Sequence, residues 1–65
     1  MTRETLRILL IDGDAERRAR VRTLLGGIKS TDYPVDEAPT FEAGLRLAGA
    51  HRHAAILVGD RLEGA

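Results

Sequence analysis

The sequence predicts an α/β fold in three layers, with one helix on each face of a three-stranded parallel sheet. Two runs, 6–11 and 54–58, are almost continuously apolar, which is typical of strands buried on both faces of a parallel sheet. Strand-like and helix-like segments alternate in the order β-α-β-α-β. Right-handed crossovers that keep the two apolar strands inside then predict the strand order 2-1-3.

The first half of the chain predicts a strand over 6–11 and a helix over 15–25. The strand ends abruptly at Asp12-Gly13-Asp14, where Asp14 can cap the helix, and Gly26-Gly27 supplies its stop. One side of this helix is expected to face the sheet, because its apolar residues recur at helical spacing. They are Val21, Leu24, Leu25 and Ile28.

The second half predicts a loop over 29–32, a strand over 33–38, a helix over 41–49 and a strand over 54–58. Pro34, Asp36 and Glu37 place the strand 33–38 at an edge of the sheet, since they suit a central strand poorly. Thr40 is the expected N-cap of the second helix. Its core-facing residues are predicted to be Phe41, Leu45 and Ala48.

Length and charge bound the function. A chain of 65 residues is one small domain or, as we expect, part of one, and without cysteine it has no disulfide or thiolate metal site. Ten Lys and Arg balance ten Asp and Glu, which argues against nucleic-acid binding. No apolar run approaches the ~20 residues of a membrane span, and the N-terminus lacks a signal-peptide pattern, so we expect a cytoplasmic protein.

The candidate site lies at the carboxyl ends of the two apolar strands. In the predicted order these strands are neighbours, and open α/β sheets bind ligands at such a switch point. Any chemistry is therefore expected around the residues that follow the two strands. These are Asp12, Gly13, Asp14, Gly59 and Asp60.

Several segments resemble the response-regulator receiver domains of two-component systems. Residues 8–14, Ile-Leu-Leu-Ile-Asp-Gly-Asp, resemble the first strand and acidic turn of that family. Residues 56–64, Ile-Leu-Val-Gly-Asp-Arg-Leu-Glu-Gly, resemble its third strand and the following loop, and 38–45 resemble the segment that enters its second helix. The resemblance covers nearly the whole chain. It implies the first half of a flavodoxin-like receiver fold in a bacterial phosphorelay protein.

This sequence lacks some of the acids that form the receiver site. In that family two acids after the first strand hold Mg²⁺, and an aspartate that ends the third strand accepts the phosphoryl group. The first acid corresponds to Asp12, the second falls at Gly13, and the phosphoacceptor position, anchored on Leu62, falls at Gly59. Asp12 alone is a weak metal ligand and is expected to accept backbone hydrogen bonds, whereas carboxylates at positions 13 and 59 together are expected to restore one metal-binding pocket.

The resemblance therefore implies a degenerate receiver that works through protein contacts, with no phosphoacceptor, no metal and no catalytic residue. Its partners would be other proteins, or the output domain of a longer regulatory chain. An active receiver would require the family's motif to be shifted by one residue along this sequence, which we call the slipped register. Asp60 would then be the phosphoacceptor and Asp14 a metal ligand, with Mg²⁺ as cofactor. Side chains alternate between the faces of a strand, so Asp60 should point away from Asp12. The interpretation preferred for Asp14 is a helix cap.

Three other readings use residues of the same sequence. Ile11-Asp12-Gly13-Asp14 resembles the nucleophile motif of haloacid-dehalogenase-like phosphatases, although Ala15-Glu16 replaces the Gly-Thr that follows it there. His51 and His53 suggest a metal site, but alternating histidines in a turn are usually solvated. The arginines of the first helix could bind a phosphate-bearing partner, although a solvated helix face is the simpler reading. They are Arg17, Arg18, Arg20 and Arg22.

The last strand also predicts self-association. Residues 54–58 are apolar and uncharged, and no segment of this sequence is predicted to pair with their outer edge, whereas Pro34 and two acids protect the strand 33–38. Unpaired backbone groups along an apolar edge recruit another strand. We therefore expect a dimer or higher oligomer joined at or near the edge of residues 54–58.

Overall fold

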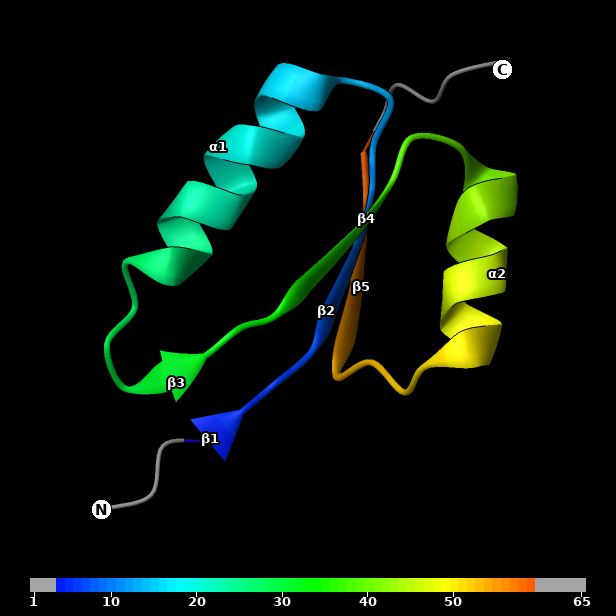
Figure 1. The fold of residues 1–65 in the computed structure, drawn as a ribbon. Coiled ribbons are helices and arrows are strands. Elements are labelled where there is room, and N and C mark those ends of the chain that lie inside the picture. The colour runs from blue at the N-terminus through cyan, green and yellow to red at the C-terminus, as the bar shows by residue number, and fades with distance from the viewer. Residues whose placement is uncertain (1–3, 60–65) are drawn as a thin grey trace.

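The computed structural model describes residues 4–59 and consists of two helices and five short strands (Figure 1). The longer strands are β2 (Ile8–Ile11), β4 (Val35–Ala38) and β5 (Ala55–Val58), and the two-residue strands are β1 (Glu4–Thr5) and β3 (Thr31–Asp32). The helices are α1 (Ala15–Gly26) and α2 (Phe41–Ala50). No helix in this part of the chain is long and apolar enough to cross a membrane.

The strands form two parallel sheets. One has three strands in the order β4-β2-β5, and the other pairs β1 with β3. In the larger sheet, Ile11 at the end of β2 is level with Ala38 of β4 and with Val58 of β5. The two helices lie on opposite sides of this sheet (Figure 1). The chain is therefore a small α/β protein with parallel strands.

The central strand β2 forms the core. All four of its residues are buried, as expected for an apolar strand covered on both faces. The predicted strand 6–11 is two residues too long, because Leu6 and Arg7 connect β2 to the small sheet. There the Leu6 amide donates to the Asp32 carbonyl at 2.9 Å.

The segment 29–38 differs from the prediction at both ends. Thr31 and Asp32, expected in a loop, form β3, and the strand predicted from residue 33 begins only at Val35. Pro34 has no N–H to donate, but its carbonyl accepts from the Ile8 amide at 2.9 Å. Pro34 therefore interrupts the strand pairing only briefly. Before the interruption β1 pairs with β3, and after it β2 pairs with β4, in both cases parallel.

Helix α2 packs on the sheet through a face that shares only Ala48 with the predicted one. Thr40 is its N-cap, as expected, since its Oγ1 accepts from the Ala43 amide at 3.1 Å. Phe41 and Leu45 are 52% and 57% exposed, so their assignment to the core is wrong. The core face is made by small residues that let the helix lie close to β2, together with one leucine. It consists of Ala43, Gly44, Leu47 and Ala48.

Helix α1 covers its side of the sheet only loosely. It extends one residue beyond the predicted 15–25, to Gly26, with Gly27 as C-cap. No residue of the helix is buried, and Leu24 of the predicted apolar stripe is 67% exposed. Ile28 lies beyond the helix end and is also exposed. Val21 and Leu25 are only half-buried, so no residue of the stripe belongs to the core. Among the described residues, the side-chain hydrogen bonds from α1 to the sheet come from Arg18 and Arg22.

The last strand, β5, is less buried than its composition predicts. It begins at Ala55 rather than Ala54, and all four of its residues are exposed. β5 pairs with β2 along one side, and the core cluster under α2 contains residues of β2 and β4 but none of β5. An apolar strand at the edge of a half-covered sheet keeps its side chains in solvent.

Candidate functional site

The carboxyl ends of β2 and β5 lie side by side, which places Asp12 next to Gly59. The Gly59 amide donates to the carbonyl of Ile11 at 2.7 Å, and the Asp12 amide donates to the carbonyl of Ala38 at 2.9 Å. Gly13 lies in the turn between β2 and α1. Asp60 and Leu62, which also entered the site prediction, lie outside the described residues.

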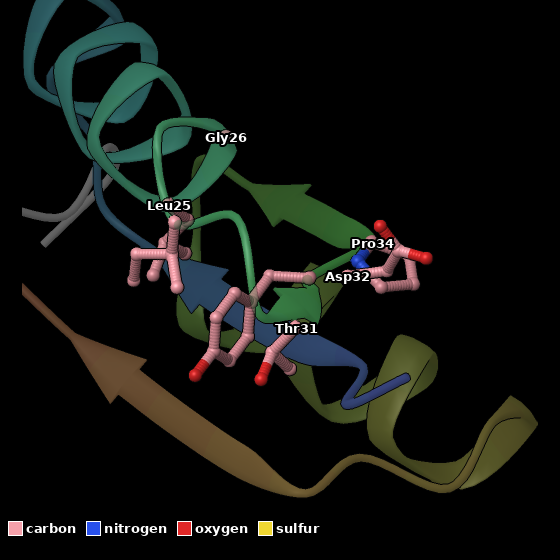
Figure 2. A pocket seen from close by; sticks show the side chains of 7 residues that line it. Leu25, Gly26, Thr31, Asp32 and Pro34 are labelled. Atoms are coloured by element: carbon pink, nitrogen blue, oxygen red, sulfur yellow. The ribbon is translucent and has the colours of Figure 1, made fainter. Parts of the chain in front are cut away.

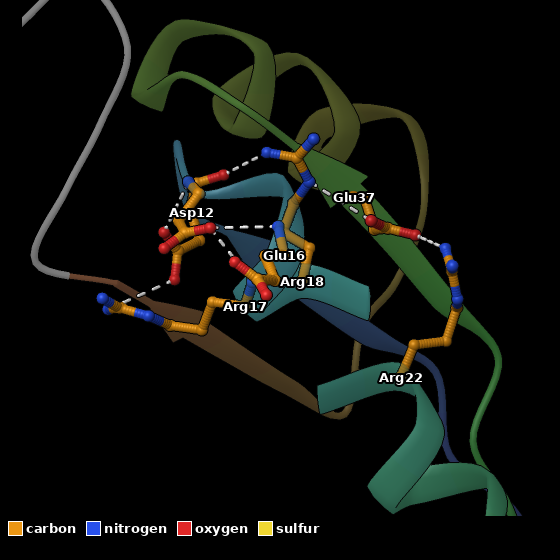
Figure 3. A network of polar contacts seen from close by, with 7 residues as sticks. Asp12, Glu16, Arg17, Arg18, Arg22 and Glu37 are labelled. Carbon is orange, nitrogen blue, oxygen red and sulfur yellow. Dashed lines mark hydrogen bonds and ion pairs between the residues drawn. The ribbon is translucent and has the colours of Figure 1, made fainter. Parts of the chain in front are cut away.

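The Asp12 carboxylate is the buried acid of this site. Asp12 is 1% exposed, and its Oδ1 accepts from the Asp14 amide at 2.9 Å, so the predicted backbone hydrogen bond is present. Its Oδ2 has no hydrogen-bond donor among residues 4–59, but Nη1 of Arg17 forms an ion pair with it at 3.5 Å (Figure 3). The charge of this buried carboxylate is therefore compensated by a cation of the chain itself.

Gly59 lies directly against that carboxylate. A Cβ atom built on Gly59 would overlap Cγ and Oδ2 of Asp12 and would lie 2.9 Å from its Oδ1. The space in which a side chain at position 59 would begin is thus filled by Asp12. The expectation that carboxylates at positions 13 and 59 together restore a metal pocket stays a prediction, and it requires the Asp12 side chain to move aside for the new side chain at 59.

Asp14 caps helix α1, as predicted. Its Oδ1 accepts from the amides of Glu16 at 3.0 Å and Arg17 at 3.2 Å. This oxygen therefore satisfies two of the amides that a helix N-terminus leaves without intrahelical partners. The cap also holds Arg17 in the first turn of α1, from which its guanidinium reaches Asp12.

The basic side of α1 is not simply solvated. Glu37 of β4 receives Nε of Arg18 at 3.2 Å on one carboxylate oxygen and Nη1 of Arg22 on the other (Figure 3). Arg18 also donates through Nη1 to the carbonyl of Asp12 at 2.6 Å. Two of the four arginines therefore hold α1 to the sheet, and a third faces Asp12. Sequence reasoning missed the partner, although Glu37 is an acid in a strand that α1 precedes.

A second polar cluster lies at the amino ends of the strands. Asp36 of β4 accepts from Nε and Nη2 of Arg7 at 2.8 and 3.1 Å, and it bonds Nε2 of His53 at 2.7 Å. The His53 side chain is 2% exposed, so the prediction of a solvated histidine is wrong, whereas His51 is exposed as expected. The bonds from Arg7 and then His53 lower the pKa of Asp36 from 3.8 to about 2.

This lowered pKa predicts a loss of stability in acid. The unfolded chain binds the Asp36 proton more tightly than the folded chain does. The stabilisation is therefore complete above about pH 4 and disappears as the pH falls toward 2, with an upper limit of about 2 kcal/mol.

Asp36→Asn should flatten this part of the stability curve, measured by urea unfolding at a series of pH values. Glu42→Gln is the control, because among residues 4–59 Glu42 pairs only with Arg46, on the exposed surface of α2. Equal acid sensitivity of wild type and Asp36→Asn would contradict the assignment.

A surface hollow of about 360 Å³ lies at the C-terminal end of α1 (Figure 2). Its lining is mainly apolar, with the polar side chains of Thr31, Asp32 and Tyr33 among it. The residues that line it are Leu25, Gly26, Ile28, Thr31, Asp32, Tyr33 and Pro34. It shares no residue with the Asp12 site.

Neither a metal-ligand group nor a similar known protein identifies the family of this chain. In residues 4–59, no group of three His, Cys, Asp or Glu side chains is arranged to hold a metal ion. No protein-family model matches the chain, and neither a curated protein nor a solved structure matches it. The resemblance to receiver domains is therefore a prediction that stands on the residues of the sequence motifs.

Proposed function

We propose that this chain is the first half of a degenerate, flavodoxin-like receiver domain in a larger bacterial signalling protein. It acts through protein contacts, with neither enzyme activity nor phosphoryl transfer. The sequence motifs carry the family assignment. The parallel arrangement β4-β2-β5, with helices on opposite sides, is compatible with it.

The observation that carries the loss of phosphoryl transfer is the contact between Asp12 and Gly59. At the position where receivers have their phosphoacceptor, this chain has no side chain, and the Asp12 carboxylate fills the space above the backbone. Asp12 is buried and faces Arg17, so a phosphoryl donor in solvent does not reach it in this conformation. An acceptor aspartate needs the opposite arrangement, with its carboxylate open to donor and metal.

The phosphatase alternative requires Asp12 as nucleophile and Asp14 as acid. The burial of Asp12 argues against attack on a substrate, and one oxygen of Asp14 already accepts two backbone amides of α1. The alternative of an active receiver depends on Asp60. It is decided by experiment, because that residue lies outside the described part of the chain.

A phosphorylation assay tests the proposal. We expect no gain of a phosphoryl group after incubation with acetyl phosphate and Mg²⁺, because position 59 offers no carboxylate and Asp12 is inaccessible. Intact-mass spectrometry measures the result directly. Asp60→Asn is the matched variant, since it removes the acid that follows Gly59 in the sequence and replaces no residue of the described site.

A hydroxylamine-labile phosphoryl adduct in the wild type would overturn the proposal. If Asp60→Asn then abolished the adduct, the active receiver with the slipped register would be correct. If the adduct persisted in Asp60→Asn and disappeared in Asp12→Asn, the nucleophile would be Asp12, as the phosphatase reading requires.

A further inference from the structure

Helix α1 is attached to the sheet mainly by charged side chains. No residue of α1 is buried, and Val21 and Leu25 are only half-buried. Helix α2, in contrast, packs its buried Gly44 directly against Ile11 of β2. The two helices are therefore held by different forces, α2 by close apolar contact and α1 by hydrogen-bonded ion pairs.

Glu37 of β4 is the acid that receives α1. One of its carboxylate oxygens accepts from Nε of Arg18 at 3.2 Å, and the other accepts from Nη1 of Arg22, one helical turn further along (Figure 3). The side chains of Arg18 and Glu37 are 17% and 26% exposed, so salt in the solvent reaches this ion pair. A single carboxylate holds both arginines, and loss of its charge releases both. We call these three residues the Glu37 clamp.

The first turn of α1 also covers Asp12. Arg18 donates through Nη1 to the Asp12 carbonyl at 2.6 Å, and Nη1 of Arg17 pairs with Oδ2 of the Asp12 carboxylate at 3.5 Å. Arg18 therefore takes part both in the Glu37 clamp and in the cover over Asp12. With α1 in this position Asp12 is 1% exposed. Movement of α1 away from the sheet would break the clamp and uncover the carboxylate together.

The position of the Glu37 clamp makes it independent of what lies beside β5. The clamp joins α1 to β4, which lies at the opposite edge of the sheet from β5. An isolated helix of 12 residues is marginal in water, and partly exposed ion pairs contribute little each. A segment held in this way is expected to open locally while the rest of the molecule stays folded.

We propose that α1 is a lid over Asp12, held shut by the Glu37 clamp and opened by salt or by loss of the Glu37 charge. In the closed state Arg17 faces the Asp12 carboxylate, as the structure shows. In the open state α1 leaves the sheet, while β2, β4 and α2 stay packed. The proposal uses no family motif and is independent of the receiver assignment.

The first test compares amide hydrogen exchange in the two helices at low and high salt. Raising the NaCl concentration from about 0.01 M to about 1 M shortens the Debye length from about 30 Å to about 3 Å. The amides of residues 18–26 should then exchange about five- to tenfold faster, as expected for the weakening of two ion pairs. Amides of α2 should not follow, since among the described residues its ion pair lies within the helix. Equal acceleration in both helices, or none in α1, would overturn the proposal.

The second test removes the charge of the Glu37 clamp. Glu37→Gln keeps the length of the side chain, and its α1 amides should exchange at low salt about as fast as those of wild type at high salt. Glu42→Gln is the matched control, because it removes an acid from the exposed surface of α2 and should leave exchange in α1 unchanged. Wild-type exchange rates in α1 of Glu37→Gln would refute the clamp. The first test needs wild type alone, so it decides the matter if Glu37→Gln does not fold.

The third test measures the accessibility of the Asp12 carboxylate. A water-soluble carbodiimide with glycinamide converts accessible carboxylates to amides, and peptide mass spectrometry locates the products. Glu42, whose side chain is 78% exposed, is the internal reference. Relative to Glu42, Asp12 should react about five- to tenfold faster in wild type at high salt, and in Glu37→Gln at low salt, than in wild type at low salt. If exchange in α1 accelerated while Asp12 stayed equally protected, α1 would not be the lid of Asp12.

Discussion

Replacing Gly44 with alanine is expected to lower the free energy of unfolding by about 1–2 kcal/mol. A Cβ atom at Gly44 would overlap Cδ1 of Ile11 and lie 2.6 Å from its Cγ1. Ile11 is itself buried between α2 and its neighbouring strands, so the helix or the isoleucine must move. Overpacking of this kind costs about 1–3 kcal/mol, which exceeds the gain of up to about 1 kcal/mol from replacing glycine by alanine in a helix.

Gly49 provides the matched control for Gly44. It lies in the same helix, and a Cβ atom there would meet nothing within 4 Å. Gly49→Ala should therefore stabilise the chain by up to about 1 kcal/mol through helix propensity alone. Urea unfolding followed by circular dichroism measures both variants. If Gly44→Ala proved as stable as Gly49→Ala, the close contact between α2 and β2 would be refuted.

Gly59→Ala is expected to destabilise the chain by about 1–3 kcal/mol, and the cost should depend on Asp12. The added methyl group would overlap the Asp12 carboxylate, which is buried and bonded to the Asp14 amide. Asp12→Ala removes the overlapping atoms. We therefore expect Gly59→Ala to cost little stability when Asp12→Ala is already present. The double-mutant cycle should give a coupling energy of about 1–3 kcal/mol between the two substitutions.

The four proteins of this cycle are compared by urea unfolding at pH 7. Gly26→Ala is the control, since a Cβ at Gly26 would also have nothing within 4 Å and its effect should not depend on Asp12. A Gly59→Ala cost that is the same with and without the Asp12 carboxylate would contradict the geometry of the site. The same crowding predicts that Gly59→Asp alone does not create a metal site.

Local patterns in the sequence were sufficient for the order of the two helices and the three longer strands and for the N-caps of the helices. Asp14 and Thr40 cap their helices as predicted, because a cap depends on hydrogen bonds within a few residues. The apolar run of β2 correctly indicated burial on both faces, and the neighbouring ends of β2 and β5 brought Asp12 to Gly59. These features follow from short-range periodicity and from the parallel connection of the strands.

The tertiary structure decided which residues are covered and by what. β5 is as apolar as β2 but remains exposed, because it lies at the edge of the sheet and contributes nothing to the core under α2. Phe41 and Leu45 were predicted in the core and are exposed, since Gly44 lets α2 settle onto Ile11 through its small residues. The side chain of His53 is buried where its Nε2 forms a hydrogen bond with the carboxylate of Asp36, 17 positions away in the chain. Periodicity identifies an apolar or charged face, but the partner of that face is set by contacts between segments that are distant in the sequence.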